Sequence, residues 1–312
     1  MTPHHPFRFG VQASTTTDAA SWTALARQVE ALGYSTLTMP DHFDDQLAPI
    51  PALMAAAAAT ETLRIGALVW DNDYKHPVVL AKELATIDVL SSGRLEIGLG
   101  AGWLATDYQR SGIPYDSPKV RVDRFEEGLA VIKGALRGEA FSFAGEHYTI
   151  TDFVGSPRPV QAPSPPILIG AGGTRMLSIA AREADIVGIN GTLAAGVVGP
   201  EAIASMTAAA VDQKIEIVHA AAGKRIEDIE FNVRAFMVRV TDERDAAVEQ
   251  IASFVDVDPS LVRESPFALI GTPAQLVDDL LRRRERWGFS YVIVGADDVE
   301  SFAPVVAELA GH

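Results

Sequence analysis

The chain has 312 residues, of which 48% are hydrophobic and 21% charged. It contains no apolar run near the ~20 residues that a membrane span requires, so we expect no membrane contact. Acidic residues outnumber basic ones by 41 to 26, and the net charge of −15 opposes nucleic-acid binding because no basic stripe offsets it. The absence of cysteine excludes disulfides, thiolate metal sites and a cysteine nucleophile. The start of the chain lacks the basic and apolar regions of a signal peptide, so we expect a cytoplasmic protein.

Short apolar runs rich in β-branched residues alternate along the chain with longer stretches of helical spacing. This alternation is typical of an α/β fold. It predicts strands over residues 7–11, 36–39, 63–69, 95–99, 167–169, 186–189, 231–240 and 291–294. It predicts helices over residues 21–32, 52–60, 77–90, 123–136, 175–184, 201–222, 241–254 and 272–287, and a last helix that ends near residue 310.

Cap residues mark the ends of several predicted helices. We expect Ser21 to cap the first helix and Gly33 to end it. Thr241 is expected to cap the helix over 241–254, and Thr272 with Gln275 to form a capping box for the next one.

Eight strand–helix units in about 300 residues fit a (β/α)8 TIM barrel better than an open doubly wound sheet. No solenoid repeat or linker interrupts the chain, so we expect one domain over residues 1–312. Segment 139–150 alternates about Ala144 and Gly145, which predicts a hairpin inserted into the barrel. In this fold the functional loops follow the C-terminal ends of the strands.

A histidine follows the second strand in the sequence Pro40-Asp41-His42-Phe43. An imidazole at that place can contact a cofactor ring or move a proton near neutral pH. Alternatively, Asp41 caps a turn and His42 is a structural loop histidine, and the spacing alone leaves both interpretations open.

The loops after the third and fourth strands are rich in aromatic and small residues. Trp70, Asp71 and Tyr74 suit the wall of a pocket for a planar ligand, or else they form an ordinary Asx-turn. The sequence Gly100-Ala101-Gly102-Trp103 permits close backbone approach to a ligand, but tight barrel packing explains its glycines equally well.

The fifth strand runs into Ala171-Gly172-Gly173-Thr174-Arg175 at the start of a helix. Backbone N–H groups at a helix N-terminus, the threonine hydroxyl and the guanidinium together favour a phosphate site. In the alternative, the glycines only make the turn and the threonine only caps the helix. Asn190, after the sixth strand, is a further candidate ligand contact, although Asn-Gly is a turn signal first.

Three segments carry a family resemblance: GYSTLTMPDHF, RIGALVWDNDYKHPVVLAKELATIDVLSSGRLEIGLGAGW and PPILIGAGGTRMLSIAAREADIVGI. They resemble the luciferase-like superfamily of TIM barrels, and within it the deazaflavin-dependent oxidoreductases that use coenzyme F420. The resemblance extends over residues 7–309 and is densest over 33–189. Its motifs separate this superfamily from other barrels but separate F420 users from FMN users poorly.

The resemblance implies that a cofactor ring lies in the barrel mouth with its phosphate on the segment after the fifth strand. It implies a backbone bulge after the third strand, often with a non-proline cis peptide, that supports the ring. The resemblance assigns Ala171, Gly172, Gly173 and Thr174 to the phosphate site and places the bulge within Ala67, Leu68 and Val69. From the strand-end segments themselves we add Gly100, Ala101, Gly102 and Arg175 as expected cofactor contacts. His42 matches the family position close to the reactive ring edge.

One residue departs from the resembled pattern. The F420-dependent sugar-phosphate dehydrogenases carry a glutamate proton donor where this chain has Trp103. Because tryptophan cannot protonate a substrate, we expect Trp103 to shape an apolar substrate pocket, together with Trp70, Asp71, Tyr74 and Asn190. The expected reaction is hydride transfer between bound F420 and a small organic substrate, without a metal and with His42 as the catalytic residue.

Two other functions stay open: an FMN-dependent monooxygenase supplied by a flavin reductase, and a cofactor-binding barrel without catalysis. We also expect a homodimer, because segments 51–60 and 77–90 are more apolar than helices packed on one side require. The alternative is that the loop over 108–122 or the hairpin over 141–148 covers these segments within one chain.

Overall fold

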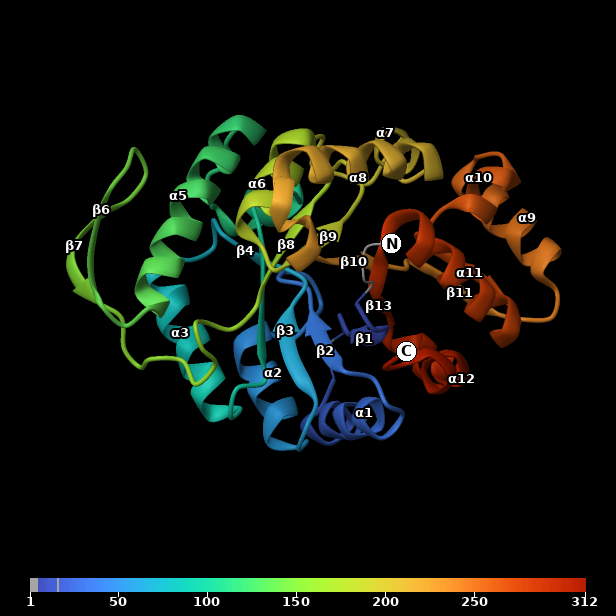
Figure 1. Cartoon of the computed structure of the whole chain (residues 1–312), viewed down its shortest axis with the longest axis horizontal. Helices are drawn as coiled ribbons and strands as arrows, with labels where there is room; N and C mark the ends of the chain where they lie inside the picture. Colours follow the sequence, from blue (N-terminus) through green and yellow to red (C-terminus); the bar gives the residue numbers. More distant parts are fainter. Residues whose placement is uncertain (1–4, 16) are drawn as a thin grey trace.

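The computed structural model describes residues 5–15 and 17–312. Residues 1–4, part of the start in which we find no signal-peptide pattern, lie outside the described residues. Within the described residues, eight parallel strands form a closed barrel (Figure 1). They are β1 (Arg8–Gln12), β2 (Thr36–Met39), β3 (Arg64–Ala67), β5 (Leu95–Gly100), β8 (Ile167–Ala171), β9 (Ile186–Ile189), β10 (Glu230–Arg234) and β13 (Phe289–Gly295). Pairing of β3 with β5 closes the circle, which confirms the predicted (β/α)8 TIM barrel.

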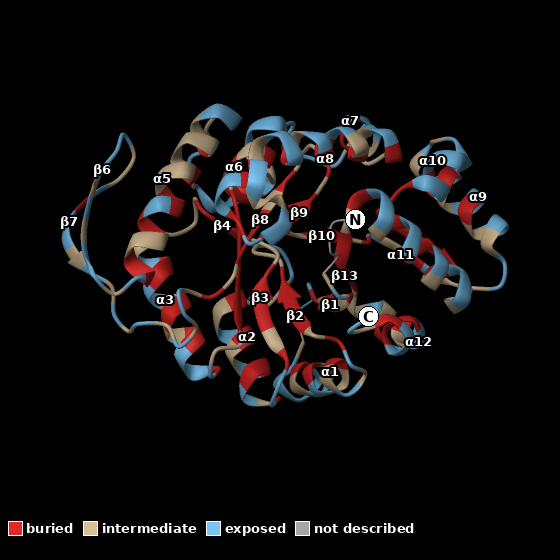
Figure 2. Ribbon diagram, in the orientation of Figure 1, coloured by how far each residue is buried: buried red, intermediate tan, exposed pale blue. Residues whose placement is uncertain are grey.

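Helices surround the barrel and turn their buried residues toward the strands (Figure 2). They are α1 (Ala19–Ala31), α2 (Pro49–Ala58), α3 (Pro77–Leu90), α4 (Ala105–Ser111), α5 (Pro118–Leu136), α6 (Thr174–Glu183), α7 (Pro200–Ala204), α8 (Ala208–Ala222), α9 (Arg244–Val255), α10 (Pro259–Glu264), α11 (Pro273–Trp287) and α12 (Val299–Leu309). Two 3-10 helices, η1 (Gly223–Asp228) and η2 (Ala296–Asp298), and a two-residue strand, β4 (Trp70–Asp71), complete the barrel.

Several predicted helix ends need correction. The Asp18 side chain accepts the Ser21 N–H at 2.9 Å, so Asp18 caps α1 and Ser21 lies inside the helix. Thr241 accepts the Glu243 N–H at 3.1 Å and holds the turn before α9 without capping it. The capping box of Thr272 with Gln275 is confirmed.

Two predicted helices have other limits than expected. The stretch 201–222 is two helices, α7 and α8, because the chain turns between them. Helix α5 begins at Pro118, five residues before the predicted start, and the loop predicted over 108–122 includes the end of α4.

The predicted seventh strand over 231–240 is wrong in its second half. The Ala235 N–H donates to Ile293 of β13, but the next N–H, of Phe236, donates to Phe267. This change of partner takes β11 (Met237–Val240) out of the barrel to pair with β12 (Ala268–Gly271), a strand the sequence did not predict. The pair packs on α9 and α10, where it closes a small separate core.

The predicted hairpin is present as β6 (Ala140–Ala144) and β7 (Thr149–Val154), which pair in antiparallel fashion. Its second strand runs four residues beyond the predicted segment. The Glu127 carboxylate on α5 accepts the N–H groups of Glu146, His147 and Tyr148 and so fixes the turn. The hairpin stands outside the barrel beyond α5 (Figure 1).

Candidate active site

A cavity of about 700 Å³ opens at the C-terminal ends of the barrel strands. The loops after seven of the eight barrel strands line it, β13 being the exception among the described strands. Most of the predicted site residues meet there: His42, Leu68, Val69, Asp71, Gly100, Ala101, Gly102, Trp103, Ala171, Gly172, Gly173 and Asn190.

Five predicted site residues do not line this cavity. Ala67 and Trp70 are buried in the protein core, with Trp70 only 1% exposed. Tyr74 lies behind the cavity wall, where its ring contacts Phe43. Thr174 and Arg175 begin α6, and both are exposed outside the cavity lining.

A backbone bulge interrupts the third strand inside the cavity. Strand β3 ends at Ala67, and the following Leu68–Val69 peptide is cis, as expected for segment 67–69. Gln12 donates to the Leu68 carbonyl at 2.9 Å, and both residues of the bulge line the cavity. A flat ligand in the barrel mouth would therefore rest on a backbone surface that is itself held by hydrogen bonds.

The glycines at the end of β5 and directly after it owe their identity to packing. A Cβ atom on Gly100 would come within 2.6 Å of Val69 in the bulge, and one on Gly102 within 1.8 Å of the Tyr108 hydroxyl. Gly102 also has a φ of +74°. The packing interpretation of this segment therefore holds, and it places the bulge and Tyr108 directly against the strand.

His42 faces a carboxylate that the sequence did not single out. Its Nδ1 lies 2.7 Å from Oδ2 of Asp107, which comes from the first turn of α4. The Tyr74 hydroxyl donates to the same oxygen at 3.0 Å, and Trp103 packs edge-on against the imidazole with ring centroids 5.8 Å apart. No predicted element includes Asp107, which lies four residues after Trp103 between the expected strand over 95–99 and the expected helix over 123–136.

Two further carboxyl groups line the cavity beside His42. Burial raises the pKa of Asp71 to about 7, and the neighbouring charge of Asp73 acts in the same direction. Burial likewise raises the pKa of Asp41 to about 6. Tyr108 is fully buried and places its hydroxyl 3.0 and 3.2 Å from the two Asp71 oxygens. This side of the cavity thus holds groups that exchange protons near neutral pH.

The opposite side is the glycine turn between β8 and α6. A Cβ atom on Gly172 would come within 2.0 Å of the Gly191 carbonyl oxygen, whereas one on Gly173 would meet nothing within 4 Å. Gly173 is the N-cap of α6, and no side chain caps its N–H groups. Backbone donors at a helix N-terminus therefore face open space, as an anion requires.

Arg175, the predicted guanidinium partner of a phosphate, lies outside the cavity lining, whereas Arg121 lies within it. Arg175 binds the carboxylates of Asp123 and Glu126 on α5 and is turned away from the cavity. Arg121 lines the cavity, is only 3% exposed, and its Nε has no hydrogen-bond partner among the described residues. It stacks on the ring of Tyr115 at 4.4 Å. The sequence offered no signal for Arg121 because it lies within the predicted loop.

A second arginine stands at the end of β10. Burial lowers the pKa of Arg234 to about 10, and Arg234 forms no ion pair among the described residues. It donates to Gln12 at 3.1 Å, and Gln12 in turn donates to the Leu68 carbonyl. The chain of hydrogen bonds links one wall of the cavity to the bulge on the other.

Asn190 lines the rim but uses its side chain locally. Its Oδ1 accepts the Gly191 N–H at 2.8 Å, which is the turn signalled by the sequence. Its backbone carbonyl accepts from the buried ammonium of Lys214, whose pKa burial lowers to about 8. Lys214 therefore fixes the loop that packs on Gly172.

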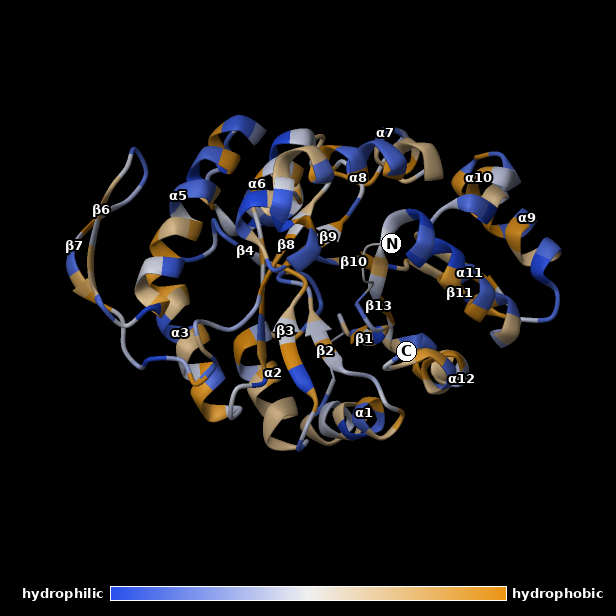
Figure 3. Cartoon of the chain, viewed as in Figure 1, coloured by the Kyte–Doolittle hydropathy of each residue, from blue (hydrophilic) through white to orange (hydrophobic). Residues whose placement is uncertain are grey.

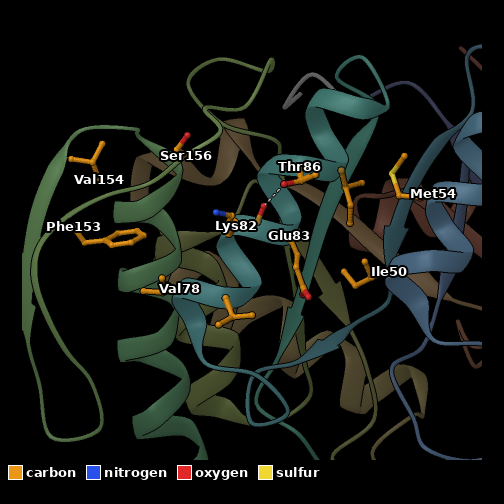
Figure 4. Close-up of a pocket in the computed structure, with 11 residues that line it drawn as sticks. Ile50, Met54, Val78, Lys82, Glu83, Thr86, Phe153, Val154 and Ser156 are labelled. Atoms are coloured by element: carbon orange, nitrogen blue, oxygen red, sulfur yellow. Dashed lines mark hydrogen bonds between the residues drawn. The ribbon is translucent and has the colours of Figure 1, made fainter.

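A separate apolar groove of about 460 Å³ lies on the outside of the barrel (Figure 4). Ile50 and Met54 of α2, Val78 of α3, and Phe153 and Val154 of β7 form its walls. It lacks the cluster of acid–base groups found in the barrel mouth, so the barrel mouth is the candidate active site.

Comparison with known proteins agrees with this geometry. Residues 4–267 match the sequence profile of the luciferase-like monooxygenase family, and the chain belongs to this family. It is 28% identical to an FMNH2-dependent dimethylsulfone monooxygenase of Pseudomonas putida over 219 residues, 70% of this chain and 56% of that protein. It is 31% identical to an F420-dependent glucose-6-phosphate dehydrogenase of Microbacterium testaceum over 192 residues, 58% of this chain and 55% of that protein. The chain thus spans just over half the length of these two relatives.

The fold is shared with a coenzyme F420-dependent tetrahydromethanopterin reductase from Methanopyrus kandleri. The TM-score is 0.76 at 19% identity, over 98% of this chain and 99% of that one. The relatives of this chain therefore include F420-dependent and FMNH2-dependent enzymes. No helix among the described residues has the length and hydrophobicity to cross a membrane.

Proposed function

We propose that the protein is an oxidoreductase that transfers a hydride between bound coenzyme F420 and a small organic substrate. The observation that carries this proposal is one cavity with an open anion cradle at Gly173 on one side and His42 on the other. The bulge at Leu68 and Val69 offers a surface for a ring between them. The bound cofactor would supply the two-electron chemistry, and the protein would supply orientation and proton transfer.

The residues of the cavity fit the parts of such a cofactor. The uncapped N–H groups at the start of α6 and the unpartnered Nε of Arg121 suit its phosphate. Trp103 supplies an apolar wall for the substrate next to His42. His42 would exchange the proton that accompanies hydride transfer.

An FMN-dependent monooxygenase served by a flavin reductase is the second candidate. The identity to the FMNH2-dependent dimethylsulfone monooxygenase favours it. A phosphate is common to FMN and F420, so the cradle suits both. A barrel that binds either cofactor without catalysis is the third outcome of the test below.

Equilibrium titration with F420 and with FMN, each reduced and oxidised, separates the three candidates. We expect F420 to bind at least tenfold more tightly than FMN, which is about 1.4 kcal/mol. Preference for FMN with oxygen-dependent turnover would establish the second candidate, and binding without any turnover over a panel of alcohols, aldehydes and ketones the third. Failure of both F420 and FMN to bind would reject all three.

We also infer a homodimer through the outer face of α2 and α3. Both helices are coloured largely toward the hydrophobic end of the scale (Figure 3), and the apolar groove runs along them. The hairpin forms one wall of this groove without closing it, since Val79 and Val154 remain 51% and 53% exposed. A second copy would bury these side chains in an isologous contact.

A further inference from the structure

We propose that Asp107 is a positioning residue for His42, which holds the imidazole so that its Nε2 atom exchanges the proton in the cavity. This inference rests on the proposed function of the same cavity. It assigns a role to a carboxylate that neither the motifs nor the resemblance singled out.

The hydrogen bonds at Asp107 determine which ring nitrogen carries the proton. The Asp107 carboxylate lies 2.7 Å from Nδ1 of His42 and 3.0 Å from the Tyr74 hydroxyl. An ionised carboxylate only accepts hydrogen bonds, so Tyr74 donates its O–H and the neutral imidazole donates from Nδ1. The other nitrogen, Nε2, then carries a lone pair, and it has no hydrogen-bond partner among the described residues of the cavity.

The surroundings keep this pair in place. Asp107 is only 5% exposed, so water competes little for its carboxylate. Trp103 packs edge-on against the imidazole at an interplanar angle of 84°. The ring of Tyr74 is held between Phe43 and Tyr108, at centroid distances of 4.4 and 5.7 Å. Aromatic packing thus fixes the ring and the phenol that bind Asp107.

This arrangement supplies a group that can exchange a proton, although Trp103 stands where the resembled dehydrogenases carry a glutamate proton donor. A hydride carries both electrons of the broken C–H bond, so the oxidation of a hydroxyl to a carbonyl also releases one proton. In the geometry described here that proton goes to Nε2 of His42, and in the reverse direction Nε2 returns it. The negative charge of Asp107 stabilises the imidazolium that forms, as a buried carboxylate does beside a histidine base.

The first test measures the tautomer and needs neither cofactor nor substrate. Protein labelled with 15N-histidine is examined by long-range 1H–15N NMR at a pH where the ring is neutral, and His42→Asn assigns the signal. We expect a proton on Nδ1 and none on Nε2. Asp107→Asn should replace this single tautomer by a mixture, whereas Asp73→Asn should leave it unchanged. Asp73 is a carboxylate next to Asp71 that binds Arg124 and Tyr108 instead of His42.

The second test measures turnover with the cofactor that the titration selects. Asp107→Asn should lower kcat by roughly 10²–10⁴-fold, the range for losing a base or its correct tautomer. The Kd of the cofactor should change less than twofold.

A proton on Nε2 in the wild-type spectrum would overturn the proposal, and so would a tautomer that Asp107→Asn does not change. The wild-type spectrum shows which ring nitrogen of His42 carries the proton even if Asp107→Asn fails to fold. Should neither F420 nor FMN bind while the tautomer responds as expected, the positioning role stands and the proposed function falls.

Discussion

Gly173→Val tests the phosphate cradle without disturbing the fold around it. Gly173 has φ −95° and ψ 155°, an extended conformation that valine adopts readily. A Cβ atom there meets nothing within 4 Å, so the new side chain enters the open space in front of α6. Replacing a glycine in a compatible conformation by alanine stabilises a protein by about 0.4–1 kcal/mol, whereas valine is a poorer N-cap than glycine. Because these effects oppose each other, we expect the free energy of unfolding to change by less than about 1 kcal/mol.

The same side chain would occupy the place of the phosphate. Displacing the anion from one backbone N–H removes a charge-assisted hydrogen bond, worth about 1.5–3 kcal/mol. At about 1.4 kcal/mol per factor of ten, this weakens cofactor binding about 10- to 150-fold. Gly172→Ala is the matched contrast, because its Cβ would come within 2.0 Å of the Gly191 carbonyl oxygen. That variant should lower the free energy of unfolding by about 1–3 kcal/mol.

Fluorescence or calorimetric titration gives the Kd, and urea unfolding gives the stability of each variant. The expected pattern is a stable Gly173→Val with weak binding and a destabilised Gly172→Ala. An unchanged cofactor Kd in folded Gly173→Val would refute the assignment of this turn as the phosphate site.

Four further predictions concern the other parts of the molecule. His42→Ala should bind cofactor normally but lose turnover roughly 10²–10⁴-fold in steady-state assays, and near-normal turnover would return it to a structural role. Arg121→Met should weaken cofactor binding about tenfold by titration, whereas Arg175→Met should change it less than twofold, because Arg175 is held by α5. Burial raises the pKa of Asp71 to about 7, so the folded state binds its proton more tightly than the unfolded chain. The contribution of Asp71 to the free energy of unfolding therefore falls as pH rises from about 4 to about 7. Asp71→Asn should show a smaller fall between urea unfolding at pH 5 and pH 8, and an equal fall would contradict the buried carboxyl. Light scattering at micromolar concentration should give a dimer and Val79→Glu a monomer; a monomeric wild type, with and without cofactor, would exclude the proposed interface.

The barrel could be predicted from the sequence because its signal is local and repeated. Each buried parallel strand is a short apolar run, and each covering helix has its own spacing and cap. The seventh strand shows the limit of that signal. Residues 231–240 read as one apolar run, but the switch of the Phe236 N–H to Phe267 depends on a segment thirty residues away. No local sequence pattern predicts that the backbone changes its hydrogen-bond partner from β13 to Phe267.

The candidate site likewise has a part that the local sequence predicts and a part that depends on tertiary structure. The place of Gly172 and Gly173 in the cavity lining could be predicted, because consecutive small residues at a strand end mark it in the chain. Arg175 was placed beside them by sequence order, but the first turn of α6 directs its side chain to α5. Arg121 lies in the first turn of α5, which was expected to be a loop, and Asp107 lies in the short helix α4. Only the closed barrel brings Arg121 to the cavity and Asp107 to His42. Their roles are properties of tertiary structure.

This division also bears on cofactor selectivity under the proposed function. Backbone N–H groups at Gly173 would recognise a phosphate and not the ring system attached to it, so the proposed cradle would accept F420 and FMN alike. Selectivity between the two must come from side chains at the ring end of the cavity. Trp103 and Arg234 line the cavity at positions that a ring on the Leu68–Val69 bulge would approach, one as an apolar face and the other as a cation without an ion-pair partner among the described residues. Arg234 is tied through Gln12 to the Leu68 carbonyl, so its position and that of the bulge are coupled. A change in Trp103 or Arg234 would therefore alter the proposed ring contacts while leaving the proposed phosphate cradle intact.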